Sequence, residues 1–194
     1  MAAPDGRHAR SERTRIAVAE AMLDCFEDGL LRPGAGDVAA RAGVSKRAVF
    51  RHFDNMEALV EQAAALHSGR IRAALPPIDF TGTREERVDS LVARATLGFE
   101  LIAPVRRAAI LFEPFSEAIR ERQAWMRAEM RRAVRRAFAQ ELSPLSNADR
   151  RDRVASLRAL LSFHYWDELR RHENLSVASA TRTVTMAVHR LLRP

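Results

Sequence analysis

Apolar residues recur at three- and four-residue steps along almost the whole chain, and this spacing restricts the fold more than any other feature. Ile16, Ala19, Leu23 and Phe26 show the pattern in its first segment. Glycine and proline are sparse and fall mostly between the periodic segments, where they interrupt helices. No strand-like alternation extends beyond a few residues. The sequence therefore predicts an all-α protein.

Helix start and stop signals divide this pattern into separate helices. The expected N-capping residues are Ser45, Asp54, Thr83 and Ser176. Pro104 suits the first turn of a helix. The expected helices cover residues 11–28, 37–42, 45–52, 54–75, 84–102, 104–113, 116–141, 148–172 and 177–192. Residues 1–10 have no apolar period and are expected to form a mobile arm.

Composition restricts the class of protein. The chain is 47% hydrophobic and 29% charged, the balance of a globular protein. No apolar run approaches the roughly 18 residues of a membrane span, and the first fifteen residues lack the apolar core of a secretory signal. Cys25 is the only cysteine, which excludes an intrachain disulfide and argues against a structural cysteine-based zinc site. We expect a cytoplasmic protein without a membrane segment.

The formal net charge of +7 favours a polyanionic partner, nucleic acid first. The most informative segment, residues 37–59, reads DVAARAGVSKRAVFRHFDNMEAL. Two short helices joined by a glycine turn form a helix-turn-helix. Gly43 can adopt the positive φ of a turn, and Val49 and Phe53 are expected to point into the core. A helical hairpin that only packs is the alternative.

The outward face of the second short helix combines basic and small residues, as entry into a major groove requires. The candidate DNA-binding residues are Ser45, Lys46, Arg47, Ala48, Phe50, Arg51 and His52. Arginine and lysine can bond guanine edges or phosphates, and Ser45 can bond a phosphate. Ala48 or Phe50 can contact a thymine methyl group or a sugar.

Residues 11–60 resemble the DNA-binding domain of TetR-type (tetracycline-repressor-like) regulators. The resemblance rests on the preceding helix, the A-x-x-A-G-V-S turn, the F-R-H-F ending, and Glu57 and Leu59 in the next helix. The later stretch ELRRHENLSVASATRTV resembles the last two helices of many such regulators. The resemblance implies a DNA-binding domain over residues 1–54 and a helical ligand-binding and dimerisation domain over residues 55–194. It also implies a repressor released by a small-molecule ligand.

Three positions depart from the pattern of this family. Many relatives have tyrosine in place of Phe50, lysine in place of Met56, and threonine where this chain has Gly34, Ala35 and Gly36. The resemblance implies that the first two residue types contact phosphates, and each departure is expected to weaken a contact with the DNA backbone. These losses leave one alternative open: a helical protein-interaction module of the same fold that no longer recognises a specific DNA sequence.

Helix-turn-helix proteins usually bind two half-sites as dimers, so we expect a homodimer on an inverted repeat of double-stranded DNA. Apolar stripes on the last two helices are the candidate dimer interface, with an intramolecular core as the alternative. The interface candidates are Val154, Leu157, Leu161, His164, Val177, Val184, Val188 and Leu191. Such stripes from two subunits would form a four-helix contact.

A ligand would need a cavity, and the middle of the chain is rich in the apolar, aromatic and methionine side chains that suit a small apolar or aromatic molecule. An ordinary core uses the same side chains. The candidate pocket residues are Leu97, Phe112, Phe115, Trp125, Met126, Met130, Phe163 and Trp166.

The sequence nominates no catalytic residue, cofactor or metal site. It contains no H-E-x-x-H, G-x-S-x-G or Walker-type motif. His164, Asp167 and Glu168 lie within one short stretch, which offers too few convergent ligands for a closed metal site. Arg127, Arg131 and Arg135 recur at four-residue intervals, with Arg132 and Arg136 beside them. This basic stripe is either a solvated helix face or a site for an anion or acidic partner.

Overall fold

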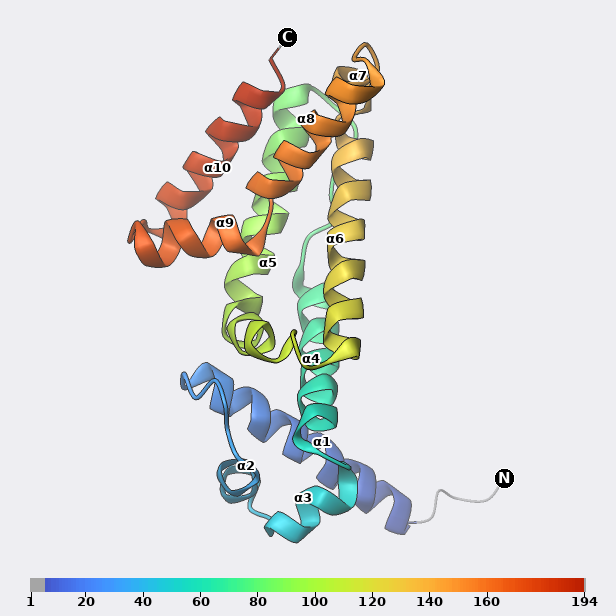
Figure 1. The fold of residues 1–194 in the computed structure, drawn as a ribbon, viewed down its shortest axis with the longest axis vertical. Coiled ribbons are helices and arrows are strands. Elements are labelled where there is room, and N and C mark those ends of the chain that lie inside the picture. The colour runs from blue at the N-terminus through green and yellow to red at the C-terminus, as the bar shows by residue number, and fades with distance from the viewer. Residues whose placement is uncertain (1–5, 194) are drawn as a thin grey trace, which may run out of the picture. The chain divides into compact units, whose positions relative to one another are not determined.

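The computed structural model describes residues 6–193, and every regular element in that range is helical (Figure 1). This confirms the predicted all-α fold. The elements are α1 (Gly6–Glu27), α2 (Ala35–Ala42), α3 (Lys46–His52), α4 (Met56–Ala74), α5 (Arg84–Phe112), α6 (Glu117–Ala137), α7 (Ala139–Leu142), α8 (Asn147–Leu160), α9 (Phe163–Asp167), the π-helical turn η1 (Glu168–His172) and α10 (Val177–Leu191). Within the described residues, no helix is long and apolar enough to cross a membrane.

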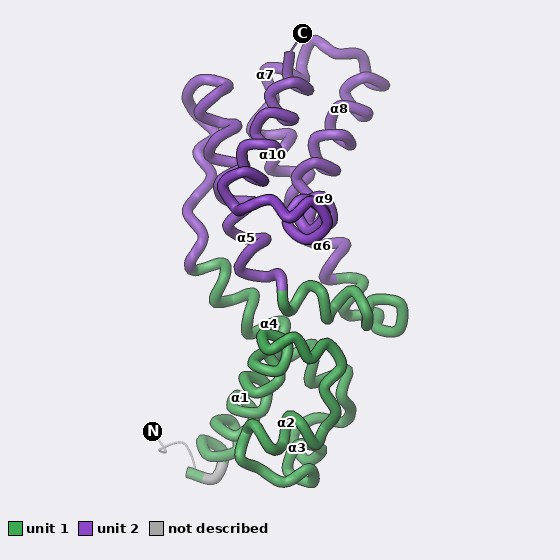
Figure 2. The backbone as a smooth tube through the Cα atoms, turned by 90° about the vertical axis from the view of Figure 1, so that its left-hand side faces the viewer, with its two compact units in different colours: residues 1–73, 104–121 green, residues 74–103, 122–194 purple. Residues whose placement is uncertain are grey.

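The chain forms two compact units, drawn in green and purple in Figure 2. Unit 1 runs through residue 73 and resumes over residues 104–121, and unit 2 comprises residues 74–103 and the chain from residue 122 onward. Helix α5 contributes to both units, and Pro104 is its first residue in unit 1. The predicted domain boundary after residue 54 stays a prediction.

Four differences from the expected helices exceed one or two residues at a boundary. Residues 6–10 belong to α1 rather than to an arm, and the arm's first five residues lie outside the described range. Helix α5 continues through Pro104 because Val105, Ala108 and Ala109 after it are buried in the core of unit 1, which outweighs the loss of one backbone donor. The helix expected over 116–141 divides into α6 and α7, and that over 148–172 divides into α8, α9 and η1.

Side-chain caps explain several helix starts. The Ser45 hydroxyl accepts a hydrogen bond from the Ala48 N–H (3.1 Å), which confirms that cap. Thr83 and Glu86 form the expected capping box, with Thr83 N–H to Glu86 Oε2 at 2.8 Å and Glu86 N–H to Thr83 Oγ1 at 3.2 Å. The predicted cap at Asp54 was wrong by one position, because Asn55 Oδ1 accepts from the Ala58 N–H at 2.8 Å.

Unit 2 has its own apolar core, formed by α5, α6, α7, α8, α9, η1 and α10. Trp166 is 1% exposed, and its ring lies 6.3 Å from that of Phe99. The Trp166 Nε1–H donates to Glu100 Oε1 (2.8 Å), which also accepts from Arg170 Nε (3.0 Å). One carboxylate of α5 therefore satisfies polar groups of both α9 and η1.

Candidate DNA-binding interface

A hydrophobic core holds α1, α2 and α3 together in unit 1. Val38 and Ala39 of α2 and Val49 of α3 are buried, and Phe53 closes the end of α3. They pack in one cluster with the buried face of α1, which includes Phe26. Because both short helices have their apolar faces in this cluster, the orientation of α3 is set by packing rather than by its own helix propensity.

The turn between α2 and α3 depends on one glycine. Gly43 has φ of 66°, in the left-handed region that glycine adopts without a steric penalty. The N–H of Val44 then donates to the carbonyl of Ala39 (3.0 Å), which completes the end of α2. Two residues after Gly43, Ser45 caps α3, so the chain reverses direction within a few residues. These contacts confirm the predicted helix-turn-helix.

The predicted contact residues occupy different environments on α3. Ser45, Lys46, Arg47, Phe50 and Arg51 are exposed, and Ala48 is half-buried. The Lys46, Arg47 and Arg51 side chains form no ion pair with any residue that the structure describes. Phe50 is 51% exposed, which is unusual for a large apolar side chain. The surface of α3 thus combines three available cations with one exposed aromatic ring.

His52, also predicted to face outward, is half-buried. Its Nε2 atom is buried and has no hydrogen-bond partner among the described residues. His52 follows the buried Val49 by three residues, and that spacing places both on the same side of the helix. On the neighbouring α1, a hydrogen bond from Arg15 lowers the pKa of the Glu12 carboxyl, and the charge of His52 contributes to the same shift. The position of His52 therefore favours a role in packing α3 near α1.

The three departures from the family pattern have different surroundings. Phe50 is exposed, Met56 packs partly against the core of unit 1, and Ala35 begins α2. The missing cap of α2 is partly replaced, because Asp37 Oδ2 accepts a hydrogen bond from the Gly34 N–H at 2.8 Å. The effect of these departures on DNA affinity stays a prediction.

The candidate pocket residues are divided between the two units. Phe112 and Phe115 belong to unit 1, and the other six belong to unit 2. Phe163 and Trp166 are buried in the core of unit 2, and Met130 packs partly against it. Leu97, Trp125, Met126 and Phe115 are exposed. Packing in the hydrophobic core thus explains the burial of Phe163 and Trp166 without a ligand. An ordinary core was the alternative that the sequence left open.

Most of the candidate interface residues are already covered within one chain. Val154, Leu157, Leu161, Val184 and Val188 are buried in the core of unit 2. Leu191 is half-buried, whereas His164 and Val177 are exposed. The five buried side chains hold α8 and α10 in their own subunit, so we place the proposed dimer contact on the opposite faces of these helices.

Cys25 is buried in the core of unit 1, and burial raises the pKa of its thiol. A raised pKa reduces the thiolate fraction on which nucleophilic attack depends. In the described part of the chain, no group of three or more histidine, cysteine or acidic side chains is placed to hold a metal ion.

Sequence reasoning missed two other features: the buried Arg87–Glu141 ion pair and the position of Arg158 opposite the basic stripe of α6.

An exposed basic helix held by an N-terminal three-helix core defines the class of helix-turn-helix proteins. Residues 26–63 match the model of the bacterial regulatory proteins of the tetR family. This match covers the helix-turn-helix and agrees with the TetR-type resemblance predicted from the sequence.

Two solved structures share the fold along nearly the whole chain. One is a transcriptional regulator from Rhodococcus sp. Rha1, with 17% identity, a TM-score of 0.68, and coverage of 94% of this chain and 95% of that chain. The other is a TetR family transcription regulator from Marinobacter aquaeolei VT8, with 18% identity, a TM-score of 0.61, and coverage of 93% and 97%. At these identities the similarity establishes the fold. No curated protein matches the sequence significantly.

Proposed function

We propose that the protein is a dimeric transcription regulator that binds a specific DNA sequence through α3. The observation that carries this proposal is the exposed face of α3, a helix fixed by the core, where Lys46, Arg47 and Arg51 form no ion pair with residues 6–193. A major groove about 12 Å wide admits one such helix.

The side chains of α3 suit different parts of the groove. Arg47 and Arg51 are four residues apart and share one side of the helix, so both can reach base edges, where arginine bonds guanine O6 and N7. Phe50 offers apolar contact with a thymine methyl group. Ser45 uses its oxygen to cap α3, and its hydroxyl hydrogen is left to donate to a phosphate.

Two copies would be needed to bind an inverted repeat, with half-sites separated by about 34 Å or a multiple of it. The outward face of α8 offers the small residues Ala155, Ser156 and Ala159, all exposed in one chain. Small side chains let helices of two subunits approach closely. We therefore assign the dimer contact to this face, together with the exposed face of the adjacent α10.

Control by a ligand completes the proposal. The family resemblance favours repression that ends when a small apolar or aromatic molecule binds among the helices of unit 2. Such a molecule shifts the protein between two states only by its difference in affinity for them. Helix α4 ends where unit 1 passes into unit 2, so a displacement of this helix would change the spacing of the two α3 helices.

Selection from a random-sequence duplex pool at near-physiological salt tests the proposal directly. We expect one inverted repeat to be enriched. We expect the Arg47→Ala, Arg51→Ala double variant to lose that enrichment, since each bidentate contact contributes about 1–3 kcal/mol to base discrimination.

The matched control removes two arginines away from α3, by Arg171→Ala and Arg193→Ala, and should enrich the same repeat. Both residues are exposed in unit 2. Salt-sensitive binding with no enriched motif would count against sequence-specific recognition and favour the interaction module.

The dimer contact can be tested separately. Ala159→Arg places a long cation on the outward face of α8, and we expect it to convert a dimer to a monomer in sedimentation velocity, because charge at an interface core is unfavourable. Ala139→Arg, at an exposed alanine of α7, serves as the control and should leave the dimer intact. A dimer that persists in the Ala159→Arg variant would place the contact elsewhere.

A further inference from the structure

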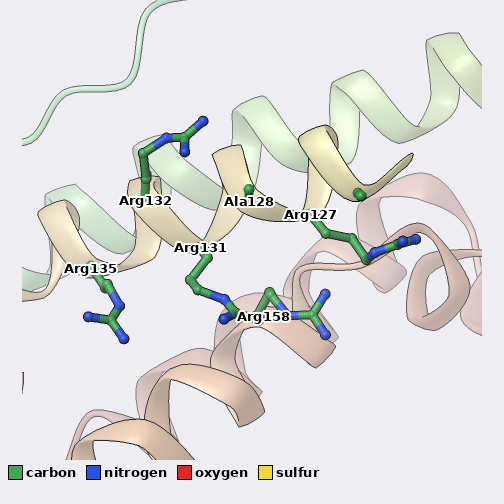
Figure 3. A pocket seen from close by; sticks show the side chains of 7 residues that line it. Arg127, Ala128, Arg131, Arg132, Arg135 and Arg158 are labelled. Carbon is green, nitrogen blue, oxygen red and sulfur yellow. The ribbon is translucent and has the colours of Figure 1, made fainter. Parts of the chain in front are cut away.

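A hollow lined by arginines lies on unit 2, between α6 and α8 (Figure 3). It is open to solvent and has a volume of about 470 Å³. Its lining residues are Ala124, Arg127, Ala128, Arg131, Arg132, Arg135 and Arg158. Five of these seven are cationic and none is acidic, so the hollow concentrates positive charge.

The arginines of α6 are arranged along one side of the helix. Arg127, Arg131 and Arg135 follow one another at four-residue steps, which places them on one face and spreads them over about 12 Å at 1.5 Å per residue. Figure 3 shows these side chains on the side of α6 from which Arg131 extends toward Arg158 of α8. Arg132 points to the other side and pairs with Glu129, so we leave it out of the site.

Three of the arginines at this site have no counter-charge among the residues that the structure describes. Arg131, Arg135 and Arg158 form no ion pair or hydrogen bond with any residue that the structure describes, and the Nε atom of Arg158 is buried without a partner. Like charges four residues apart on a helix repel each other. By contrast, the buried Arg87 pairs with Glu141, and the half-buried Arg170 pairs with Glu100.

We propose that this hollow binds a small molecule with two or more anionic groups, either phosphates or carboxylates, spaced along α6. The planar guanidinium offers paired donors that match the oxygens of both groups. Arg131 and Arg158 hold one group between the two helices, and Arg135 binds a second group one helical turn away. This site is independent of the proposed DNA-binding function, because it uses none of the residues of α3.

Isothermal titration calorimetry of the full chain with inorganic tripolyphosphate and with citrate tests the site. At about 0.15 M salt the screening length is about 8 Å, so attraction by the overall positive charge is weak and direct contacts dominate. We expect saturable binding of one anion per chain. The Arg131→Gln, Arg158→Gln double variant should bind more than roughly tenfold more weakly, because charge-assisted bonds from both helices are lost.

The control variant, Arg171→Gln with Arg193→Gln, removes the same charge from exposed positions outside the hollow and should bind within about twofold of the native protein, since its effect is limited to screened long-range attraction. Equal weakening in both double variants, or no saturable binding of either probe, would overturn the proposal. Binding of tripolyphosphate alone identifies a phosphate ligand, and binding of citrate alone identifies a carboxylate ligand.

Binding of a random-sequence DNA duplex to the same variants provides a further test of the site. If the Arg131→Gln, Arg158→Gln variant loses duplex binding while neither small anion binds the native protein, the hollow contacts nucleic acid and the proposal is wrong. Thermal unfolding without an anion checks the variant's fold. We expect the Tm of this variant at low salt to equal or exceed that of the native protein, because repulsion between the arginines is relieved. A marked drop in Tm would mean that Arg131 or Arg158 has a stabilising partner within the chain.

Discussion

Replacing Phe53 by alanine is expected to lower the free energy of unfolding by about 3–5 kcal/mol, whereas Phe50→Ala should change it by less than about 0.5 kcal/mol. The two residues lie three positions apart at the end of α3, but Phe53 is 5% exposed and Phe50 is 51% exposed. Phe53 packs in the core that joins α1, α2 and α3. Its loss leaves a cavity that this small core cannot refill.

Comparison of these two variants separates an effect on protein stability from an effect on DNA binding. Urea unfolding followed by far-ultraviolet circular dichroism is the suitable measurement, because Trp125 and Trp166 both lie in unit 2 and do not report on this core. We expect Phe50→Ala to weaken binding to the selected duplex while the unfolding curve stays in place. Equal destabilisation by the two variants would mean that Phe50 is part of the core rather than of the DNA-binding surface.

The second large effect concerns the ion pair between Arg87 and Glu141 in unit 2. We expect Glu141→Ala to lower the free energy of unfolding by about 3 kcal/mol, because it leaves a buried guanidinium without its counter-charge. The Arg87 and Glu141 side chains are 5% and 16% exposed, with Nη2 to Oε1 at 2.7 Å and Nη1 to Oε2 at 3.2 Å. Arg87 also donates to the carbonyl of Ala137 at the end of α6.

Tryptophan fluorescence during urea unfolding measures this effect, because both tryptophans share unit 2 with the pair. Glu85→Ala breaks the exposed pair of Arg84 and Glu85 and should leave the curve nearly unchanged. The Arg87→Met, Glu141→Leu double variant removes both charges and should recover much of the loss. If Glu141→Ala lowered the free energy of unfolding as little as Glu85→Ala, water would be forming hydrogen bonds with the Arg87 guanidinium. The ion pair would then not stabilise unit 2.

Features that depend on neighbouring residues could be predicted from the sequence. The cap at Ser45, the turn at Gly43 and the capping box of Thr83 and Glu86 each involve residues within about four positions of one another. Local geometry decides these features wherever the segment lies in the fold. The same locality explains why the exposed face of α3 could be assigned before its partners in the core were known.

Pro104 and His52 show where local rules gave the wrong result. Pro104 was expected to begin a helix, but the residues after it are held in the core of unit 1 and α5 continues through it. His52 was expected to lie on the outward face, because Val49 and Phe53 were the residues of this helix assigned to the core. In the structure His52 is half-buried, and its Nε2 atom is covered by neighbouring residues that the local sequence did not identify.

The sequence by itself determined the helical class, the helix-turn-helix and the cations that α3 presents, because these follow from periodicity and from contacts between near neighbours. Only the tertiary structure decided which surface covers each apolar stripe. Periodicity identifies an apolar face but not its partner, so the stripes of α8 and α10 could have faced a second subunit until their burial within one chain was known. The structure likewise decided that Arg158 lies opposite Arg131, because that proximity depends on how α6 and α8 pack.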